Sequence, residues 1–132
     1  MPIKVGDSAE RTTLITDERI RQFAAASGDM NSIHLDEEAA AQTRFGRRIA
    51  HGMLTASLIS AVLGNDLPGV GSIYLSQSVK FKAPVFLGDT ITARVTVTAY
   101  REDKRIVTLK TDCLNQDGQL VLEGEAVVIA PE

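Results

Sequence analysis

The segment AHGMLTASLISAVL, residues 50–63, carries the strongest structural pattern in the chain. Its apolar residues are spread over most of the circumference of a helix rather than along one stripe: Met53, Leu54, Leu58, Ile59, Val62 and Leu63. A helix that is apolar nearly all round is buried, whereas a surface helix keeps one polar face. We therefore expect a buried central helix that ends near Gly64 and needs cover on every side.

Strands are predicted after Pro68-Gly69, where the sequence becomes rich in Val, Ile and Thr with two-residue alternation. The predicted strands are residues 72–82, 90–101, 105–115 and 120–130, with another at residues 11–15. Asp117-Gly118 predicts a two-residue hairpin between the last two strands. Pro84 cannot donate a ladder hydrogen bond, which indicates a crossing loop at residues 82–89. Helices followed by consecutive strands predict an α+β fold with an antiparallel sheet.

Two shorter helices are predicted before residue 50. Thr16 is a good N-cap for the first, acidic residues follow it in the first turn, and Gly28 ends the apolar periodicity. The second is predicted at residues 37–43, with Asp36 as its cap. A sheet covers only one side of the central helix, so the N-terminal segments or a partner subunit must cover the rest.

Length and composition limit the class of protein. The 132 residues suit a single domain, residues 1–132. A net charge of -3 argues against nucleic-acid binding, for which a basic patch is expected. The one cysteine, Cys113, excludes an internal disulfide and a thiolate-rich zinc site, and it fits a cytoplasmic protein. A signal-peptide pattern and an apolar run long enough for a bilayer are both missing, so no membrane association is expected.

The segment SGDMNSIH, residues 27–34, places the carboxylate of Asp29 five residues before the imidazole of His34. Burial raises the pKa of a carboxyl group, and histidine titrates near neutrality, so the pair suits acid–base catalysis. Gly52 begins the central helix, where backbone N–H groups can stabilise charge on a substrate carbonyl. A carboxylate, an imidazole and backbone N–H donors together could catalyse the addition of water to a polarised double bond. The Gly-Asp-x-Asn spacing also fits a plain turn, and the residues alone leave both interpretations open.

These segments resemble the MaoC-like dehydratases, and among them the (R)-specific enoyl-CoA hydratases. The matching residues are Phe23, Gly28-Asp29-Met30-Asn31, Ile33-His34, the small residues Ala39 and Ala40, and the segments 45–53 and 79–90. Ser32 stands where that family usually has proline, which would stiffen the loop between the two catalytic residues. The resemblance extends over nearly the whole chain in order.

The resemblance implies a hotdog fold, in which a curved antiparallel β-sheet wraps a long central helix, normally as a homodimer joined edge to edge. It implies reversible hydration of trans-2-enoyl-CoA to (R)-3-hydroxyacyl-CoA by a hydro-lyase. Asp29 and His34 become the catalytic pair, and the Gly52 N–H becomes the oxyanion donor. Asn31 and Ser60 become supporting residues near the loop and the catalytic water. Each has a local alternative, because Asn31 could cap a turn and Ser60 could bond within its helix.

No metal and no redox cofactor are implied, since coenzyme A is part of the acyl-CoA thioester substrate. The resemblance fits fatty-acid or polyhydroxyalkanoate metabolism and leaves the acyl chain length and the pathway open. Two alternatives stay open, namely an acyl-CoA thioesterase that uses Asp29 and a non-catalytic acyl-CoA or acyl-carrier binding module.

Several other side chains carry weaker predictions. Arg44, Arg47 and Arg48 could bind coenzyme A phosphates or form a solvated basic rim. His51 is predicted to hold the loop before the central helix. Tyr74 and Phe81 are predicted to pack within the sheet.

Overall fold

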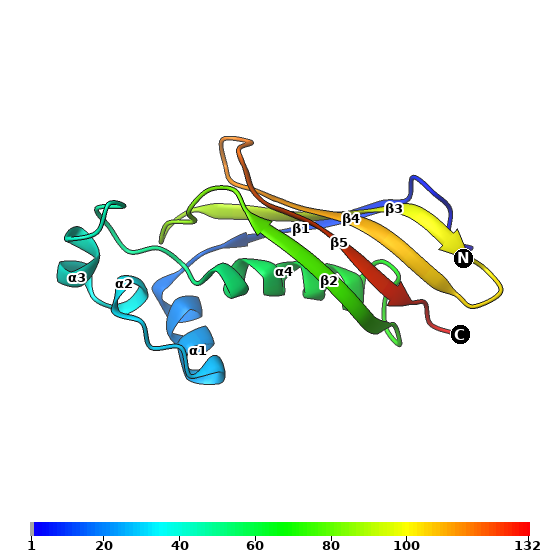
Figure 1. Ribbon diagram of the computed structural model, residues 1–132, viewed down its shortest axis with the longest axis horizontal. Helices are drawn as coiled ribbons and strands as arrows, with labels where there is room; N and C mark the ends of the chain where they lie inside the picture. The colour runs from blue at the N-terminus through cyan, green and yellow to red at the C-terminus, as the bar shows by residue number, and fades with distance from the viewer. Residues whose placement is uncertain (1) are drawn as a thin grey trace.

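Helix α4 (Gly52–Asn65) lies against one face of a five-stranded sheet in the computed structural model, which describes residues 2–132 (Figure 1). Helices α1 (Asp17–Ser27), α2 (Ser32–Leu35) and α3 (Glu37–Ala41) gather beyond its N-terminal end. The strands are β1 (Ser8–Leu14), β2 (Ile73–Phe81), β3 (Thr90–Arg101), β4 (Ile106–Leu114) and β5 (Leu120–Ile129). The predicted central helix, with helices before consecutive strands, is confirmed.

The sheet order is β1-β3-β4-β5-β2, and every neighbouring pair is antiparallel. The chain must therefore cross from β2 at one edge to β3 near the other, as the crossing loop at residues 82–89 predicts. Register shifts between Tyr74 and Ser76 and between Val97 and Ala99 mark irregularities of the β-bulge kind, which bend a sheet. The antiparallel α+β prediction is confirmed.

The core forms where one face of α4 meets the inward side chains of the sheet. Its largest fully buried members include Ile59, Leu63, Ile91, Val95, Val107 and Leu109. The alternation predicted for residues 105–115 is confirmed, because Val107, Leu109 and Cys113 are buried while Lys110 is exposed. Burial raises the pKa of the Cys113 thiol to about 12, so this cysteine is a core residue rather than a reactive one.

Cover for α4 is incomplete in the single chain. Met53, Ser57 and Ser60 are exposed on the helix, and Tyr74 and Phe81 are exposed on the edge strand β2. The prediction that Tyr74 and Phe81 pack within the sheet is therefore wrong. Strand alternation shows which residues share a face, but the outermost strand has no neighbour on one side to cover them.

The predicted helix caps are confirmed, whereas some boundaries differ. Thr16 Oγ1 accepts from Arg19 N at 3.1 Å, and Gly28 ends α1 in the left-handed region with φ 81°. Asp36 caps α3, which ends at Ala41 instead of residue 43. Helix α4 begins at Gly52, because His51 before it has a non-helical backbone with ψ 136°. Ala50, two residues before Gly52, donates its N–H to Val85 O at 2.7 Å.

The hairpin between β4 and β5 is longer than the two-residue turn predicted from Asp117-Gly118. Asn115 N donates to Gln119 O, which encloses three residues, and Gly118 is left-handed at φ 75°. The Asn115 side chain accepts from the N–H groups of Asp117 and Gln119 and so stabilises the wider loop. In residues 2–132 no helix has the length and apolar character that a membrane span requires.

Candidate active site

The loop between α1 and α2 is built by side chains that bond to their own backbone. Asp29 Oδ1 accepts from Asn31 N at 3.2 Å, and Asn31 Oδ1 accepts from Ile33 N at 3.3 Å. Asn31 is thereby the N-cap of α2, the single turn that carries His34. The local capping alternative for Asn31 is thus observed. Helix α2 itself was not predicted, because one turn of four residues is too short for apolar periodicity to show.

His34 is buried, and its ring is held in one orientation. Its Nδ1 lies 2.7 Å from the carbonyl oxygen of Ile49, and donation by Nδ1–H leaves the Nε2 lone pair free. Burial lowers the pKa of His34 below 6.5, and nearby His51 adds to the shift. The imidazole is therefore neutral at pH 7 and can accept a proton at Nε2.

Arg48 fixes the backbone beneath His34. Its Nε donates to His34 O at 2.6 Å, its Nη2 to Asp17 Oδ1 at 2.6 Å, and its Nη1 to Glu37 Oε1 at 3.5 Å. The guanidinium, only 6% exposed, thus joins α1, α2 and α3. Arg48 first, and then Arg21, lower the pKa of Asp17. A guanidinium committed to these contacts is not free for phosphate, which excludes the phosphate hypothesis for Arg48.

His51 links Asp29 to His34. Its Nε2 donates to the backbone oxygen of Asp29 at 2.9 Å, and its ring stacks on His34 with centroids 3.9 Å apart. Phe23 lies on the same imidazole at 4.9 Å. His51 is 2% exposed, and its Nδ1 has no hydrogen-bond partner among residues 2–132. The predicted loop-holding role of His51 is confirmed.

These contacts bring together a carboxylate and two imidazoles. The Asp29 carboxylate and ring nitrogens of His34 and His51 lie within 4.8 Å of one another. One water molecule can bridge polar atoms at this separation. The two imidazole rings lie at an interplanar angle of 30°. A carboxylate beside a neutral imidazole is an arrangement suited to acid–base chemistry. Asp29 is exposed in the single chain.

Gly52 is the first residue of α4, and the ring of Phe81 lies over it. A Cβ placed on Gly52 would lie 2.7 Å from Phe81 Cε1. His51 precedes the helix without a side-chain cap, so within the described chain no side chain caps the first N–H groups of α4. They remain available to a carbonyl oxygen. Sequence reasoning placed Phe81 in the sheet but missed its contact with Gly52, because a strand pattern does not show which distant residue lies opposite a side chain.

Two cavities flank this region. One of about 290 Å³ includes Gly52 and Phe81, and the other of about 510 Å³ includes Phe23, Met53 and Ser60. In the described chain neither cavity is lined by Asp29 or His34. Ser60 is two turns from Gly52, about 12 Å along the helix at 1.5 Å per residue. The structure therefore joins Asp29 and His34 and places Ser60 on the larger cavity.

A helix wrapped by an antiparallel sheet, with an Asp–His pair near the helix N-terminus, defines a MaoC-like hotdog protein. A family model described as "MaoC like domain" matches residues 3–116, and the chain belongs to this family. The hotdog prediction is confirmed by solved structures of the same fold.

Known (R)-hydratases are similar to this chain in both sequence and structure. The chain is 53% identical over 129 residues to the (R)-specific enoyl-CoA hydratase of Aeromonas caviae, covering 98% of this chain and 96% of that protein. A solved structure described as the (R)-hydratase from A. caviae involved in PHA biosynthesis matches with a TM-score of 0.95, 53% identity and 98% of both chains. The R-hydratase PhaJ1 from Pseudomonas aeruginosa matches with a TM-score of 0.94 and 45% identity, covering 98% and 83%.

Proposed function

We propose that this protein is an (R)-specific enoyl-CoA hydratase, a hydro-lyase that adds water reversibly to trans-2-enoyl-CoA. One observation carries the proposal: the Asp29 carboxylate and the His34 imidazole lie within 4.8 Å near the start of α4. The 53% identity to a protein named for this activity supports it over nearly the full length. By analogy with the A. caviae protein, we propose polyhydroxyalkanoate metabolism as a pathway that uses the product.

In the proposed mechanism, Asp29 and His34 hold one water molecule over the β-carbon of the substrate. As the water oxygen bonds to the β-carbon, one of these groups takes a proton from the water, and the group so protonated supplies the proton that is delivered to the α-carbon on the same face. The free Nε2 of His34 and the carboxylate oxygens of Asp29 are hydrogen-bond acceptors suited to this water. The product is the (R)-3-hydroxyacyl-CoA.

The Gly52 N–H is the proposed donor to the thioester carbonyl, on which enolate-like charge develops. Such a donor typically contributes about 3–4 kcal/mol to the transition state. The thioester already polarises the double bond, so we propose that the reaction needs neither a metal nor a redox cofactor. We also propose a cytoplasmic location, in keeping with the lone buried cysteine.

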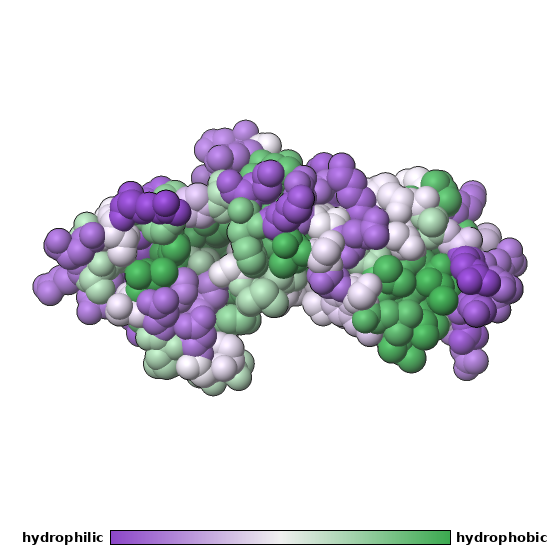
Figure 2. Space-filling model, in the orientation of Figure 1, coloured by the Kyte–Doolittle hydropathy of each residue, from purple (hydrophilic) through white to green (hydrophobic). Residues whose placement is uncertain are grey.

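We further propose that the enzyme acts as a homodimer. Strand β2 is an outer edge of the sheet and exposes Ile73, Tyr74 and Leu75. Figure 2 shows apolar side chains gathered over the start of β2. A second copy that pairs its own β2 antiparallel to this edge would satisfy the free backbone groups. It would also cover Met53 on α4, which is 59% exposed.

The test is loss of enoyl-thioester absorbance with crotonyl-CoA, followed by chiral analysis of the product and a free-thiol assay. We expect (R)-3-hydroxybutyryl-CoA without thiol release. Thiol release would instead identify the acyl-CoA thioesterase. Binding of the thioester with neither hydration nor hydrolysis, across short and medium acyl chains, would identify the non-catalytic binding module.

A further inference from the structure

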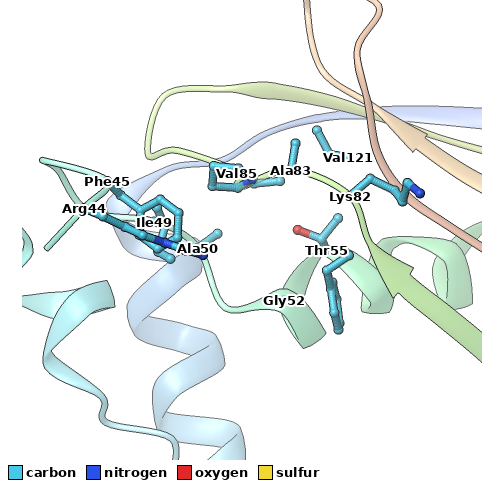
Figure 3. A pocket seen from close by; sticks show the side chains of 12 residues that line it. Arg44, Phe45, Ile49, Ala50, Gly52, Thr55, Lys82, Ala83, Val85 and Val121 are labelled. Carbon is cyan, nitrogen blue, oxygen red and sulfur yellow. The ribbon is translucent and has the colours of Figure 1, made fainter.

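The smaller cavity has a role that the proposed mechanism leaves open. Its volume is about 290 Å³, at the small end of the range of roughly 300–1,000 Å³ usual for ligand sites. Figure 3 shows it between the loop after α3, the start of α4 and the chain that leaves β2. Ile49, Ala50, Ala83, Val85 and Val121 form apolar walls. Gly52 lies at the same cavity, so an occupant can reach the proposed carbonyl site.

A buried hydroxyl without a partner faces this cavity. Thr55 is 2% exposed, and its Oγ1 has no hydrogen-bond partner in the chain from residue 2 to residue 132. Figure 3 shows the Thr55 oxygen directed toward the space between Ala50 and Val85. Ser57 on the same helix instead bonds back to Leu54 O at 2.6 Å. Burying a hydroxyl without a hydrogen bond is unfavourable, so Thr55 is placed to bond to a polar group of an occupant.

A cation lies at the mouth of the cavity. Arg44 lines it, and its guanidinium carbon lies 4.9 Å from the centre of the Phe45 ring. Figure 3 shows the Arg44 side chain lying alongside Ile49 and Ala50. Among the described residues Arg44 forms no ion pair, whereas Lys82 lies 3.7 Å from Glu123. The ammonium of Lys82 also points away from the cavity (Figure 3). Arg44 is therefore free for an anion.

The two cavities differ in the charge of the side chains that line them. The larger one is lined by Phe23, Met53, Leu75, Val79 and polar uncharged residues, with no charged side chain from the described part of the chain. A phosphate group is stabilised by a guanidinium and not by an uncharged apolar wall. The phosphate-bearing end of a thioester substrate is thus directed to the smaller cavity.

We propose that the smaller cavity binds the phosphopantetheine arm of the coenzyme A thioester. The Thr55 hydroxyl bonds to an amide of the arm, the apolar walls contact its methylene and methyl groups, and Arg44 binds a phosphate at the mouth. The volume suits this slender arm rather than the whole of coenzyme A. The inference rests on the proposed function for its choice of ligand, and it assigns Arg44 as the residue that recognises the phosphate end.

The first test compares hydration of crotonyl-CoA with that of crotonyl-pantetheine, which has no phosphate. Arg44→Gln should raise KM for crotonyl-CoA about tenfold, a loss of roughly 1.4 kcal/mol, with kcat unchanged. The same variant should leave KM for crotonyl-pantetheine unaltered. Arg101→Gln, which removes an exposed arginine paired with Asp103, is the control and should change neither value. Equal effects of Arg44→Gln on both substrates, or none on either, would overturn the assignment.

The second variant is Thr55→Val, which replaces the hydroxyl by a methyl group of similar size. It should leave the free protein as stable as before or more stable, because an unpaired hydroxyl is removed. It should nevertheless raise KM for both substrates several-fold, since both carry the pantetheine amides. Unchanged KM values for Thr55→Val would contradict the proposed amide contact.

A binding measurement separates this inference from the hydratase proposal. Calorimetry measures the Kd of coenzyme A for the wild-type protein and for Arg44→Gln. We expect the Kd for the wild-type protein to be about tenfold lower. If no thioester is hydrated but this difference is found, the hydratase proposal fails and the cavity assignment stands. If coenzyme A binds wild type and Arg44→Gln equally, or does not bind wild type, the cavity assignment fails whatever the activity.

Discussion

Ser32 occupies the first helical position of α2, at the point where the chain departs from its family's usual proline. A helix offers no acceptor to the N–H at this position, and proline is common there. Asn31 has φ -56° and ψ 128°, a conformation that a following proline tolerates.

Ser32→Pro should therefore raise the free energy of unfolding by about 0.4–1 kcal/mol, because it restricts the unfolded chain. Turnover should be unchanged, since no functional group near Asp29 and His34 is lost. Urea unfolding of the purified variant measures the effect, with Ser32→Ala as the control. A destabilised Ser32→Pro protein would show that the backbone at this turn differs from the one described.

The lowered pKa of His34 predicts how activity depends on pH. Neutral His34 is the form that accepts a proton, so kcat/KM should fall on the acid side with an apparent pKa below 6.5. The free energy of unfolding also depends on the pKa of His34. Between the folded pKa and 6.5 the unfolded chain binds more protons than the folded chain does. The contribution of neutral His34 to the free energy of unfolding is therefore complete above pH 6.5 and is lost as the pH falls toward the folded pKa.

The measurement is the free energy of unfolding from pH 7.5 to pH 5, for wild type and for His34→Gln. The difference between the two curves should shrink as the pH falls through this window. A His34 contribution that grows toward low pH would contradict a lowered pKa, and so would an acid limb of kcat/KM above 6.5.

At the scale of elements, Gly124 sets how closely β2 and β5 approach. A Cβ on Gly124 would lie 1.8 Å from the backbone oxygen of Ser78 on β2. Gly124→Ala should therefore destabilise the protein by about 1–3 kcal/mol or more, because the two backbones must move apart. Gly64→Ala in α4 is the matched control. No described atom lies within 4 Å of its Cβ, and it should stabilise the helix by about 0.5–1 kcal/mol. Thermal or urea unfolding distinguishes the two, and a harmless Gly124→Ala would refute the β2–β5 register.

The elements that could be predicted are those whose evidence is local in the chain. The period of apolar residues indicated α4 and the strands, and caps such as Thr16 and Asp36 marked where helices begin. The Asp29–His34 motif was visible because its two members are close in sequence. Arg48, Phe81 and Thr55 acquire their places through contacts between distant segments, and neither composition nor spacing reports such contacts.

At the scale of the whole molecule, the exposed edge of β2 and the uncovered side of α4 form one incomplete surface. The larger cavity lies between them, lined by Met53 and Ser60 on α4 and by Tyr74, Leu75 and Val79 on β2. A second copy on this surface would complete the cover that an apolar central helix requires. The proposed dimer interface would therefore include the larger cavity.

Leu75→Glu should disrupt the dimer, because it places a charge on the apolar edge where Leu75 is 51% exposed. Light scattering after size-exclusion chromatography should give twice the chain mass for wild type and the single-chain mass for the variant. Val5→Glu changes an equally apolar exposed residue elsewhere and should stay dimeric. A monomeric wild-type protein would contradict the proposal.

The most direct test of the central claim is the turnover of Asp29→Asn with crotonyl-CoA, measured beside wild type on a protein shown to be folded. The substitution keeps the size of the side chain and removes its ability to take a proton. General acid–base catalysis predicts that turnover falls by about 10²–10⁴, and the same fall is expected for His34→Ala. Near-normal turnover by folded Asp29→Asn would contradict the assignment of the Asp29–His34 pair as the catalytic site.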